Sequence, residues 1–432
     1  MNAVKTSSSP ASDPQVVAWI GLDWADQAHE IRLQVVGSEQ VESFTVEQKP
    51  EALHAWVAQL RARFPQGKVA LALEQSRGAV IYALMNYDFL LLYPVPPKTL
   101  ARYREAFIGS GAKSDPRDAD LLLELVRAHS HRLRAWQPDD QVTRQLRLLV
   151  EHRRKTVDNR TALTNQLTDL LKTYFPQALE WATDLRKEGA CDFLEAWPSL
   201  QALQGVSHSK LRDFYRGHTR LSGEALEQRL REIAQARPLT EDPALLGASV
   251  LMTRMLVLQL RSVIAAVARL DKAIEELFAT HPDQQIFNSL PGAGVALGPR
   301  LAVAFGTDRK RYLSAGEIHQ FSGIAPVTLS SGKKRVVHWR VACPKFLRQT
   351  FHEFADASRK KSLWAQAYYE QQRQQGASHH AVIRALAFKW IRILYHLWKT
   401  HTPYDEFVYL NALQKRRSPL WLRTTVLREV HS

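Results

Sequence analysis

Hydrophobic and polar positions in the first 135 residues follow the pattern of a mixed α/β domain. Apolar, β-branched runs predict strands at 16–24, 31–37, 41–48, 69–74 and 91–96. Amphipathic stretches between and after them predict helices at 50–64, 79–86, 98–107 and 117–128. Three adjacent strands are therefore followed by alternating helices and strands. This order is typical of a ribonuclease H-like fold, a mixed sheet flanked by helices, although a fold alone does not define a function.

Long helices dominate the middle of the chain. The basic stretch 142–174 has a heptad-like seam of leucines, interrupted by Arg153 and Arg160. A cleaner seam follows, in which apolar residues recur in alternating steps of four and three: Leu256, Leu260, Val263, Val267, Leu270, Ile274 and Leu277. This spacing predicts a coiled coil or an antiparallel helical hairpin, with one helix of an ordinary bundle as the alternative. The stretch 182–248 is helical and charged, and it contains no recognisable motif.

The composition changes again after Pro291, where the chain becomes richer in Gly, Lys, Arg and aromatic residues. We therefore place a domain boundary near Asp283. The resulting division is a disordered tail, an α/β domain, a helical linker with an insertion, and a mostly helical C-terminal domain, with bounds 1–15, 16–135, 136–282 and 283–432.

The charge of the chain points to a polyanionic partner. The formal net charge is +15, and Lys and Arg side chains bind phosphates with release of counterions. No apolar run approaches the roughly 18 residues of a transmembrane helix, and the first residues lack the apolar core of a secretion signal. These features favour nucleic acid over a membrane. Two cysteines, Cys191 and Cys343, are too few for a disulfide scaffold, so we expect a reducing, cytoplasmic setting.

Four acidic residues of the first domain stand at positions where a sheet can bring them together. Asp23 ends the first predicted strand, Glu74 ends the fourth, and Asp115 and Asp118 begin the last helix. Residues spaced i, i+3 share a helix face. The first and fourth strands are neighbours in a ribonuclease H-like sheet, and the last helix packs across them. Clustered carboxylates need a cation, and Mg²⁺ prefers oxygen ligands, so the sequence predicts a magnesium site suited to phosphodiester chemistry.

Each acidic residue also has a structural interpretation. An Asp at a strand end is commonly a turn residue, and Asp115 is suited to cap a helix with Pro116 at its first position. Asp26 and Asp120 are rival ligands in the same stretches. The ordered set of four carries more weight than any single member.

The last third contains two further motifs. PGAG precedes an apolar helix and resembles a helix-hairpin-helix element that binds DNA backbone, although a tight turn between packed helices explains it almost as well. Ser330 and Ser331 precede Gly332 and a basic run, whose cations could stabilise charge on an attacked phosphate. Flexible turns and solvated basic faces often have the same composition. A basic, aromatic helix follows, and the candidate nucleic-acid ligands are Lys333, Lys334, Arg335, Arg340, Arg384, Lys389 and Arg392.

Taken together, these segments resemble the DEDD transposases of the insertion sequence 110 family. The matching pieces are GLDWADQAHE, LALEQSRG, KSDPRDADLL, SLPGAGVALGPRLAVAFG and FSGIAPVTLSSG, in the order of the family and across nearly the whole chain. The resemblance implies a RuvC-like first domain, a coiled-coil linker and a C-terminal domain with a catalytic serine. Its carboxylates would be Asp23, Glu74, Asp115 and Asp118, all binding Mg²⁺. The family's serine lies five residues after a proline, here Pro326, which favours Ser331 over Ser330.

The resemblance also implies a reaction and its partners. The serine attacks a DNA phosphodiester and forms a transient covalent link, while a structured bridge RNA pairs with donor and target DNA. The family members assemble as homodimers or homotetramers that share sites between protomers. We expect the protein in the bacterial cytoplasm, at the nucleoid when it is bound to DNA. This chain departs from the family in two places: Gln75-Ser76-Arg77-Gly78 replaces a common Thr-Gly pair, and VVHWRVACPKFLRQT replaces a Gly-rich segment. Two other functions remain open, a hydrolytic RuvC-like nuclease or junction resolvase and a non-catalytic dimeric nucleic-acid-binding protein.

Overall fold

The computed structural model describes residues 15–74, 78–107, 115–219, 221–332 and 334–424, without the side chains of Phe107 and Asp115. The chain divides into two compact units, Met1–Pro138 and Asp139–Ser432. The tail predicted for 1–15 lies outside the described residues, apart from Gln15. The domain bounds drawn from composition stay a prediction.

The first unit is a mixed α/β domain built on one five-stranded sheet. Its strands are β1 (Val16–Asp23), β2 (Ala28–Val35), β3 (Val41–Glu47), β4 (Lys68–Leu73) and β5 (Leu90–Pro94). Their spatial order is β3-β2-β1-β4-β5. β1 pairs antiparallel with β2 and parallel with β4, β3 is antiparallel to β2, and β5 is parallel to β4. The prediction that the first and fourth strands are neighbours is confirmed, and each strand lies within a few residues of its predicted position.

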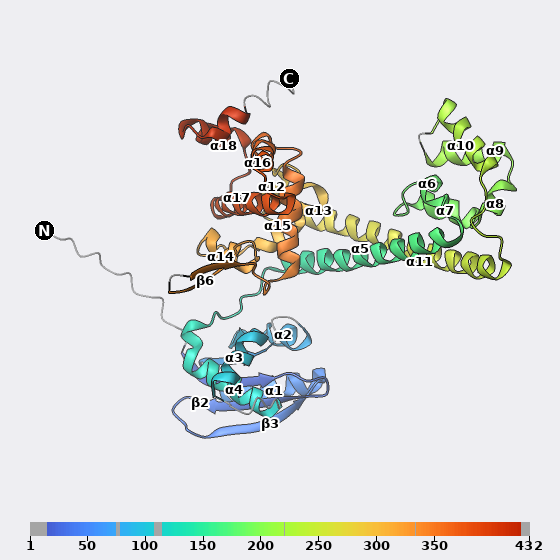
Figure 1. Cartoon of the computed structure of the whole chain (residues 1–432). Coiled ribbons are helices and arrows are strands. Elements are labelled where there is room, and N and C mark those ends of the chain that lie inside the picture. The colour runs from blue at the N-terminus through green and yellow to red at the C-terminus, as the bar shows by residue number, and fades with distance from the viewer. Residues whose placement is uncertain (1–14, 75–77, 108–114, 220, 333, 425–432) are drawn as a thin grey trace. The chain divides into compact units, whose positions relative to one another are not determined.

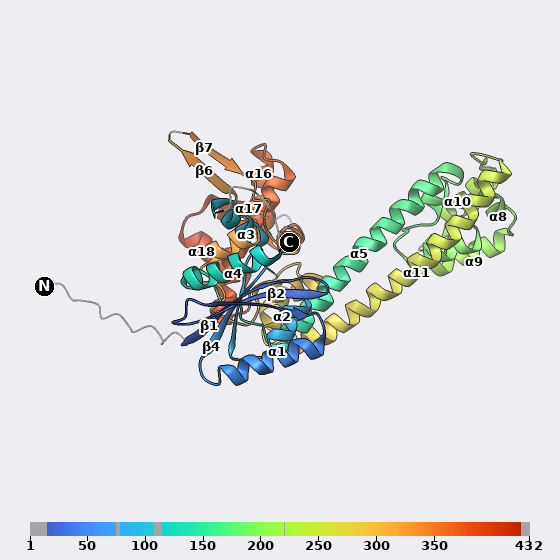
Figure 2. The same cartoon turned by 90° about the horizontal axis from the view of Figure 1, so that it is seen from below.

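Alternation along the strands gives the sheet two apolar faces. The helices are α1 (Pro50–Arg63), α2 (Ala79–Leu84), α3 (Pro97–Phe107) and α4 (Asp115–His129), followed by the short η1 (Ser130–Arg132). One face carries Ile20, Leu22 and Leu71 against α1 and α2. The other face carries the small residues Ala70 and Ala72 against α3 and α4 (Figure 2). The small side chains bring α4 close to the centre of the sheet.

Two long helices form the frame of the second unit. α5 (Gln141–Tyr174) and α11 (Pro243–Ala279) pack side by side along much of their length (Figure 1). They run antiparallel, because Thr143 bonds to His281 beyond the end of α11 and Tyr174 bonds to Thr253 near its beginning. The antiparallel helical hairpin is therefore present. Of the predicted seam, Leu256, Leu260, Val267 and Ile274 are buried and the other three positions are partly buried. A supercoil is not established by these contacts and stays a prediction.

The arginines on the first seam are accommodated by polar contacts. Arg153 of α5 forms an ion pair with Asp271 of α11, so its charge is compensated across the helix pair. Arg160 has no such partner for its Nε atom, which is buried without a hydrogen bond among the described residues. The charged interruptions therefore lie within the hairpin rather than disrupting it.

The stretch without a recognisable motif forms a small helical domain at one end of the hairpin (Figure 1). Its helices are α6 (Ala178–Trp181), α7 (Glu188–Ala196), α8 (Leu200–Gln204), α9 (His208–His218) and α10 (Gly223–Gln235). Phe193, Trp197 and Tyr215 pack there against Leu167 of α5 and Leu256 of α11. This core explains why the stretch folds, and it assigns the stretch no chemistry.

The C-terminal helices surround the other end of the hairpin. They are α12 (Gln284–Asn288), α13 (Gly294–Phe305), α14 (Ala315–Phe321), α15 (Lys345–Ser358), α16 (Leu363–Gln374), α17 (His379–Thr400) and α18 (Glu406–Lys415), with a hairpin of β6 (Val327–Ser331) and β7 (Lys334–His338) between α14 and α15. Leu146 of α5 and Ile274 of α11 share one hydrophobic core with these helices. The PGAG turn lies between α12 and α13. At its Gly292 φ is +79°, and an added Cβ would lie 2.7 Å from the Ala357 carbonyl oxygen, so glycine is required there.

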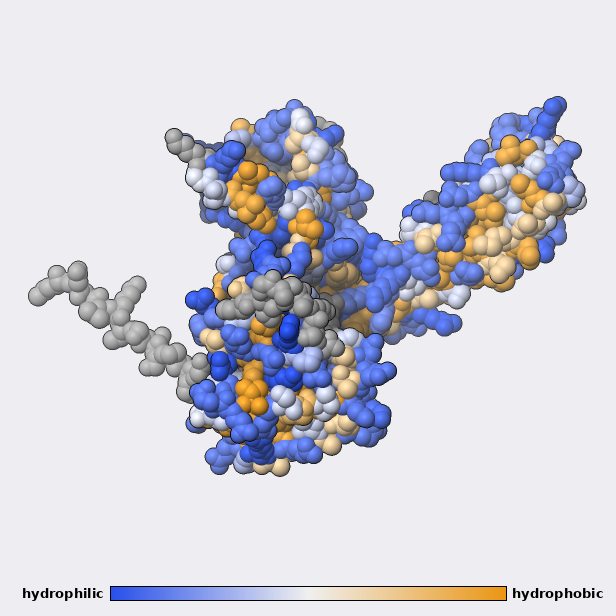
Figure 3. Space-filling view, turned by 60° about the horizontal axis from the view of Figure 1, so that its bottom comes forward, coloured by the Kyte–Doolittle hydropathy of each residue, from blue (hydrophilic) through white to orange (hydrophobic). Residues whose placement is uncertain are grey.

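The length and composition of α11 differ from the expectation that the chain has no apolar run as long as a transmembrane helix. Among the described residues it is the one helix long and apolar enough to do so, by length and composition alone. The uninterrupted apolar run is shorter because Arg254 and Arg261 break it. One side of α11 packs within the unit, and the other exposes apolar side chains: Leu251, Met252, Met255 and Leu258. Apolar residues also gather on the visible face of the part formed by α5, α11 and the helices α6 to α10 (Figure 3).

Candidate functional site

The direction of α4 brings its first turn to the end of β1. Near the start of α4, Asp120 accepts a hydrogen bond from Arg32 Nε of β2 at 2.8 Å. Near its end, Arg127 donates to Gln34 of β2 at 3.2 Å. β2 passes Asp23 near its own beginning and then runs away from it. α4 therefore runs antiparallel to β1 and begins at the Asp23 end of the sheet.

Asp23 and Glu74 lie side by side at that edge. β1 and β4 are parallel neighbours with Leu22 opposite Leu73. Asp23 is the last residue of β1, and Glu74 directly follows β4. Asp23 is buried and Glu74 half-buried. Because side chains alternate along a strand, Asp23 faces the α4 side, opposite to Leu22 in the α1 and α2 core.

Gly21 sets the distance between this edge and α4. A Cβ added at Gly21 would collide with the carbonyl oxygen of Ala119 and the backbone nitrogen of Leu123. The backbones of strand and helix are therefore in direct contact two residues before Asp23. Asp118 directly precedes Ala119, so the close approach places its carboxylate near the end of β1.

Asp118 is fully buried and is paired with a cation from the neighbouring helix. Arg104 of α3 donates to Asp118 Oδ1 through Nη2 and through Nε, the latter at 3.1 Å. Asp118 Oδ2 is buried and has no hydrogen-bond partner among the described residues. A buried carboxylate oxygen without a donor costs free energy unless a cation or water satisfies it.

The rival acidic residue of α4 has a structural role. Asp120 is exposed and is held by Arg32, whose Nη1 also donates to Glu30 at 3.2 Å. This ion-pair network crosses from the helix to β2. This ion pair distinguishes Asp120 from Asp118, whereas the sequence alone left both as candidate ligands. Asp26 lies in the turn after β1 and takes part in no ion pair shown by the described residues.

The residues present fit a divalent cation in the chemistry of their side chains, because carboxylate oxygens are the ligands that such an ion prefers. Asp23, Glu74 and Asp118 supply oxygen ligands at one end of the sheet, and Asp118 Oδ2 is available. Among the described side chains no three His, Cys, Asp or Glu groups already converge into a ready-made cluster. The fourth predicted ligand, Asp115, begins α4 one helical turn before Asp118, but its side chain lies outside the described residues.

The two serines lie at the tip of the β6–β7 hairpin. In its register Ser330 is opposite Arg335 and Ser331 is opposite Lys334. Gly332 follows with φ +55°, a left-handed conformation that glycine adopts readily in tight turns. Adjacent strand residues point to opposite faces, so each serine has a different cation across from it. All four side chains are exposed.

The predicted nucleic-acid ligands have different environments. Lys334, Arg335 and Arg392 are exposed, whereas Lys333 lies outside the described residues. Arg340 Nε donates to the Ala325 carbonyl at 3.3 Å. Lys389 is half-buried with its ammonium 4.7 Å from the centre of the Tyr368 ring, and burial lowers its pKa. Arg384 is half-buried against Trp339.

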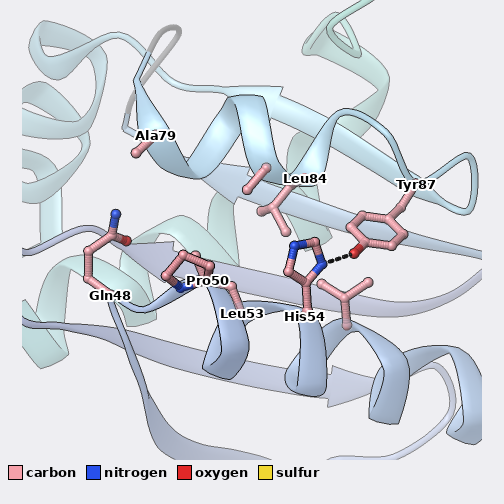
Figure 4. Close-up of a pocket in the computed structure, with 9 residues that line it drawn as sticks. Gln48, Pro50, Leu53, His54, Ala79, Leu84 and Tyr87 are labelled. Atoms are coloured by element: carbon pink, nitrogen blue, oxygen red, sulfur yellow. Dashed lines mark hydrogen bonds between the residues drawn. The ribbon is translucent and has the colours of Figure 1, made fainter.

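A small pocket in the first unit lies on the other face of the sheet. It is lined by residues of α1 and α2, among them Leu53, His54 and Leu84 (Figure 4). His54 Nδ1 and the Tyr87 hydroxyl lie 2.6 Å apart across it. The pocket is mostly apolar and contains none of the predicted carboxylates.

Three residues that shape these sites were absent from the sequence predictions. Gly21 begins the GLDWADQAHE motif that contains Asp23, and a glycine within an apolar strand is a known signal of close backbone approach. Arg104 gives no such signal, because pairing between α3 and α4 depends on their packing. Trp339 lies in VVHWRVACPKFLRQT, the segment that departs from the family pattern, and no local feature of the sequence indicates its contacts.

Two known protein families match parts of this chain. Residues 20–176 match the family model of DEDD transposases of the IS110 type, and residues 284–370 match that of the transposase IS116/IS110/IS902 family. The chain is 27% identical over 402 residues to the mini-circle putative transposase for IS117 of Streptomyces coelicolor, covering 91% of this chain and 97% of the relative.

Other relatives align over a similar length. An uncharacterized 42 kDa protein of insertion element IS900 from Mycobacterium paratuberculosis is 24% identical over 391 residues, which cover 89% of this chain and 96% of the relative. The IS116 44.8 kDa protein of Streptomyces clavuligerus is 25% identical over 379 residues, covering 87% and 93%. The two family models together cover more than half of the sequence, in the order in which the carboxylate and serine motifs occur. The chain belongs to the IS110 family of DEDD transposases.

Proposed function

We propose that this transposase excises and inserts its element with a serine nucleophile and a RuvC-like, ribonuclease H-like carboxylate site. The observation that carries the proposal is that Asp23, Glu74 and the first turn of α4 belong to the same edge of the sheet. Structural carboxylates are normally satisfied by neutral donors or cations. Asp118 Oδ2 is not, which supports a role in binding a cation.

Asp23, Glu74, Asp115 and Asp118 would hold Mg²⁺, an ion suited to carboxylate oxygens. When bound, it would neutralise negative charge on the phosphate oxygens and act as a Lewis acid. The chain's own contribution is to hold the ligands rigidly: two follow strand ends, and Asp118 is fixed on a helix pressed against Gly21. Arg104 keeps Asp118 compensated when no cation is present.

Ser331 would carry the covalent step. Its Oγ loses a proton, forms a bond to phosphorus, and displaces a deoxyribose oxygen that takes up a proton. A hydroxyl of another strand reverses these steps and joins the strands. Lys334, opposite Ser331, would stabilise the added charge on the phosphate. The number of phosphodiester bonds is conserved, so no external energy source is required.

DNA and a bridge RNA would be held by the basic surface of the second unit. The net charge of +15 and the exposed cations Lys334, Arg335 and Arg392 support this part of the proposal. Base pairing by the RNA would choose the target, so few side chains need to read bases.

A trapping assay tests the serine. We would incubate the protein with labelled element-end DNA, the adjacent RNA and Mg²⁺, denature it, and separate protein-linked DNA from free DNA. We expect an adduct that disappears in Ser331→Ala and persists in Ser330→Ala. Cleaved DNA without an adduct would indicate hydrolysis by the carboxylate site instead. Undiminished adduct in Ser331→Ala would refute its role as nucleophile.

Self-association through the helical hairpin completes the proposal. Leu251, Met255 and Leu258 form an exposed apolar stripe on α11 with helical spacing. A second copy would cover it and form a homodimer or homotetramer. We expect Leu251→Glu with Leu258→Glu to lower the mass measured by light scattering to that of a monomer, while Leu239→Glu, at an exposed site outside α11, leaves it unchanged. A monomeric wild-type protein would contradict this part.

A further inference from the structure

Trp339 is the centre of a cationic cluster at the base of the serine hairpin. It directly follows β7 and is 42% exposed. The guanidinium carbon of Arg384 on α17 lies 3.2 Å from the centre of its ring, and that of Arg348 on α15 lies 5.4 Å away. The ring of His352, also on α15, meets the indole edge-on at 6.4 Å.

This cluster lacks the negative charge that accompanies two other arginines of the unit. Arg300 pairs with Glu353, and Arg309 pairs with Asp283. In the described part of the chain Arg348 and Arg384 form no ion pair with a carboxylate. Arg348 donates instead to a backbone carbonyl, that of Arg340, at 3.2 Å.

The cations repel one another. Burial and then Arg348 lower the pKa of Arg384. Burial lowers the pKa of His352 to about 4, and Arg384, Arg348 and His380 add to the effect. His352 is therefore neutral at pH 7. The neighbouring side chains that contribute to these two shifts are all basic: Arg348, Arg384 and His380.

Two nitrogen atoms of the cluster are buried, and neither has a hydrogen-bond partner among the described residues. Arg384 Nε is a donor, and His352 Nε2 is a donor in the tautomer that carries its proton there. A guanidinium stacked on an aromatic ring keeps its N–H groups in plane and available at its edge. Buried donors without partners are costly, and a bound anion would satisfy them.

We infer that Arg348, Arg384 and Trp339 form a site for a phosphodiester group of a DNA strand. The inference rests on the proposed function, in which the serine hairpin acts on DNA. Trp339 holds the Arg384 guanidinium in place, and Arg348 adds the second positive charge. Ser331 is opposite Lys334, which lies five residues before Trp339. At about 3.3 Å per residue, the serine and Trp339 are about 17 Å apart along the hairpin. The site would hold the same DNA strand at a fixed distance from the attacked phosphate.

Salt-dependent binding tests the site. We would measure fluorescence anisotropy of a fluorescein-labelled DNA duplex between 50 and 300 mM NaCl, concentrations chosen to span roughly the range where counterion release is resolved. Arg384→Gln and Arg348→Gln should each weaken binding about tenfold and lower the slope of log affinity against log salt by about one. Lys210→Gln, which removes an exposed cation of α9, is the matched control and should change neither.

Further arms separate the possible ligands. Circular dichroism identifies a misfolded variant, and Arg348→Gln still tests the site if Arg384→Gln fails to fold. Wild-type salt slopes in both folded variants would overturn the inference. A loss seen only with RNA of the same sequence would overturn its assignment to DNA. Inorganic phosphate that displaces the duplex at constant ionic strength would do the same, by indicating a site for a free anion.

The trapping assay on the same proteins separates this inference from the proposed function. An adduct in the wild type, with unchanged salt slopes in both variants, would refute the phosphate site alone. Lowered slopes without any wild-type adduct would refute the serine mechanism and leave the site standing.

Discussion

The carboxylates of the first unit and the serines of the second unit are supported in opposite ways. Asp23 and Asp118 are buried, and each is fixed by backbone that contacts backbone at Gly21. Ser330 and Ser331 are exposed on a two-stranded hairpin whose side chains have no second layer over them. An isolated pair of strands is only marginally stable in water, whereas a five-stranded sheet with helices on both faces is rigid.

Under the proposed function, in which the carboxylates bind a cation and Ser331 is the nucleophile, the difference implies a division of labour. A cation site depends on ligands held to within a fraction of an ångström, and a buried scaffold supplies that precision. A nucleophile that must reach a bulky polymer benefits from exposure on an element that nucleic acid can reorganise. In this view changes around the carboxylates should affect both stability and chemistry, and changes at the β6–β7 hairpin should affect chemistry more than stability.

Asp118→Asn should have the largest effect on chemistry. The substitution keeps the size of the side chain and removes the charge that a cation requires. We expect adduct formation to fall about a thousandfold, or about 4 kcal/mol in the barrier. Asp120→Asn is the control, because Asp120 is exposed and bonded to Arg32. Equal losses in the two variants, measured as initial rates of adduct formation, would argue against a special role for Asp118.

Gly21→Val should have the largest effect on stability. Its side chain would push α4 away from β1, at a cost of about 3 kcal/mol. Hydrogen exchange followed by mass spectrometry should show faster exchange in β1 and β4 and unchanged exchange in α5 and α11. The matched change at the hairpin is Gly332→Ala, where an added Cβ meets nothing within 4 Å and only the positive φ is strained. It should cost about 1 kcal/mol. A larger loss of stability in Gly332→Ala than in Gly21→Val would contradict the contrast between the two regions.

The sheet and its carboxylate edge were predictable because strand periodicity and strand order are local features of the sequence. Asp23 and Glu74 follow buried apolar runs, and parallel neighbours bring such positions together. The contact that completes the edge was not predictable. It depends on the absence of a side chain at Gly21 and on the direction of α4, which long-range packing decides.

The hairpin and its surroundings show the opposite balance. The basic run was plain in the sequence, but the β-hairpin was not predicted: Ser330 and Ser331 end strand β6, and Gly332 follows in the turn. The stacking of Arg384 on Trp339 joins residues that are far apart in the chain, so no local pattern indicates it. The same holds for the domain formed by α6 to α10, whose aromatic core arises from short helices without a repeating seam.

Arg104→Gln should have a smaller effect that depends on the metal. Without a divalent cation the variant leaves the buried Asp118 carboxylate uncompensated, which should lower the stability of the first unit by about 2 kcal/mol. With Mg²⁺ or Mn²⁺ the cation supplies the missing charge, so the variant should gain more thermal stability on metal addition than the wild type. Arg102→Gln, an exposed change on the same helix, is the control. Melting curves in EDTA and in each metal measure the difference. A variant that is destabilised equally with and without metal would show that Arg104 supports packing alone. If the variant melts at the same temperature as the wild type in EDTA, water compensates the charge of Asp118. The carboxylate edge of the first unit would then be solvated, as the exposed β6–β7 hairpin is, despite the burial of Asp118.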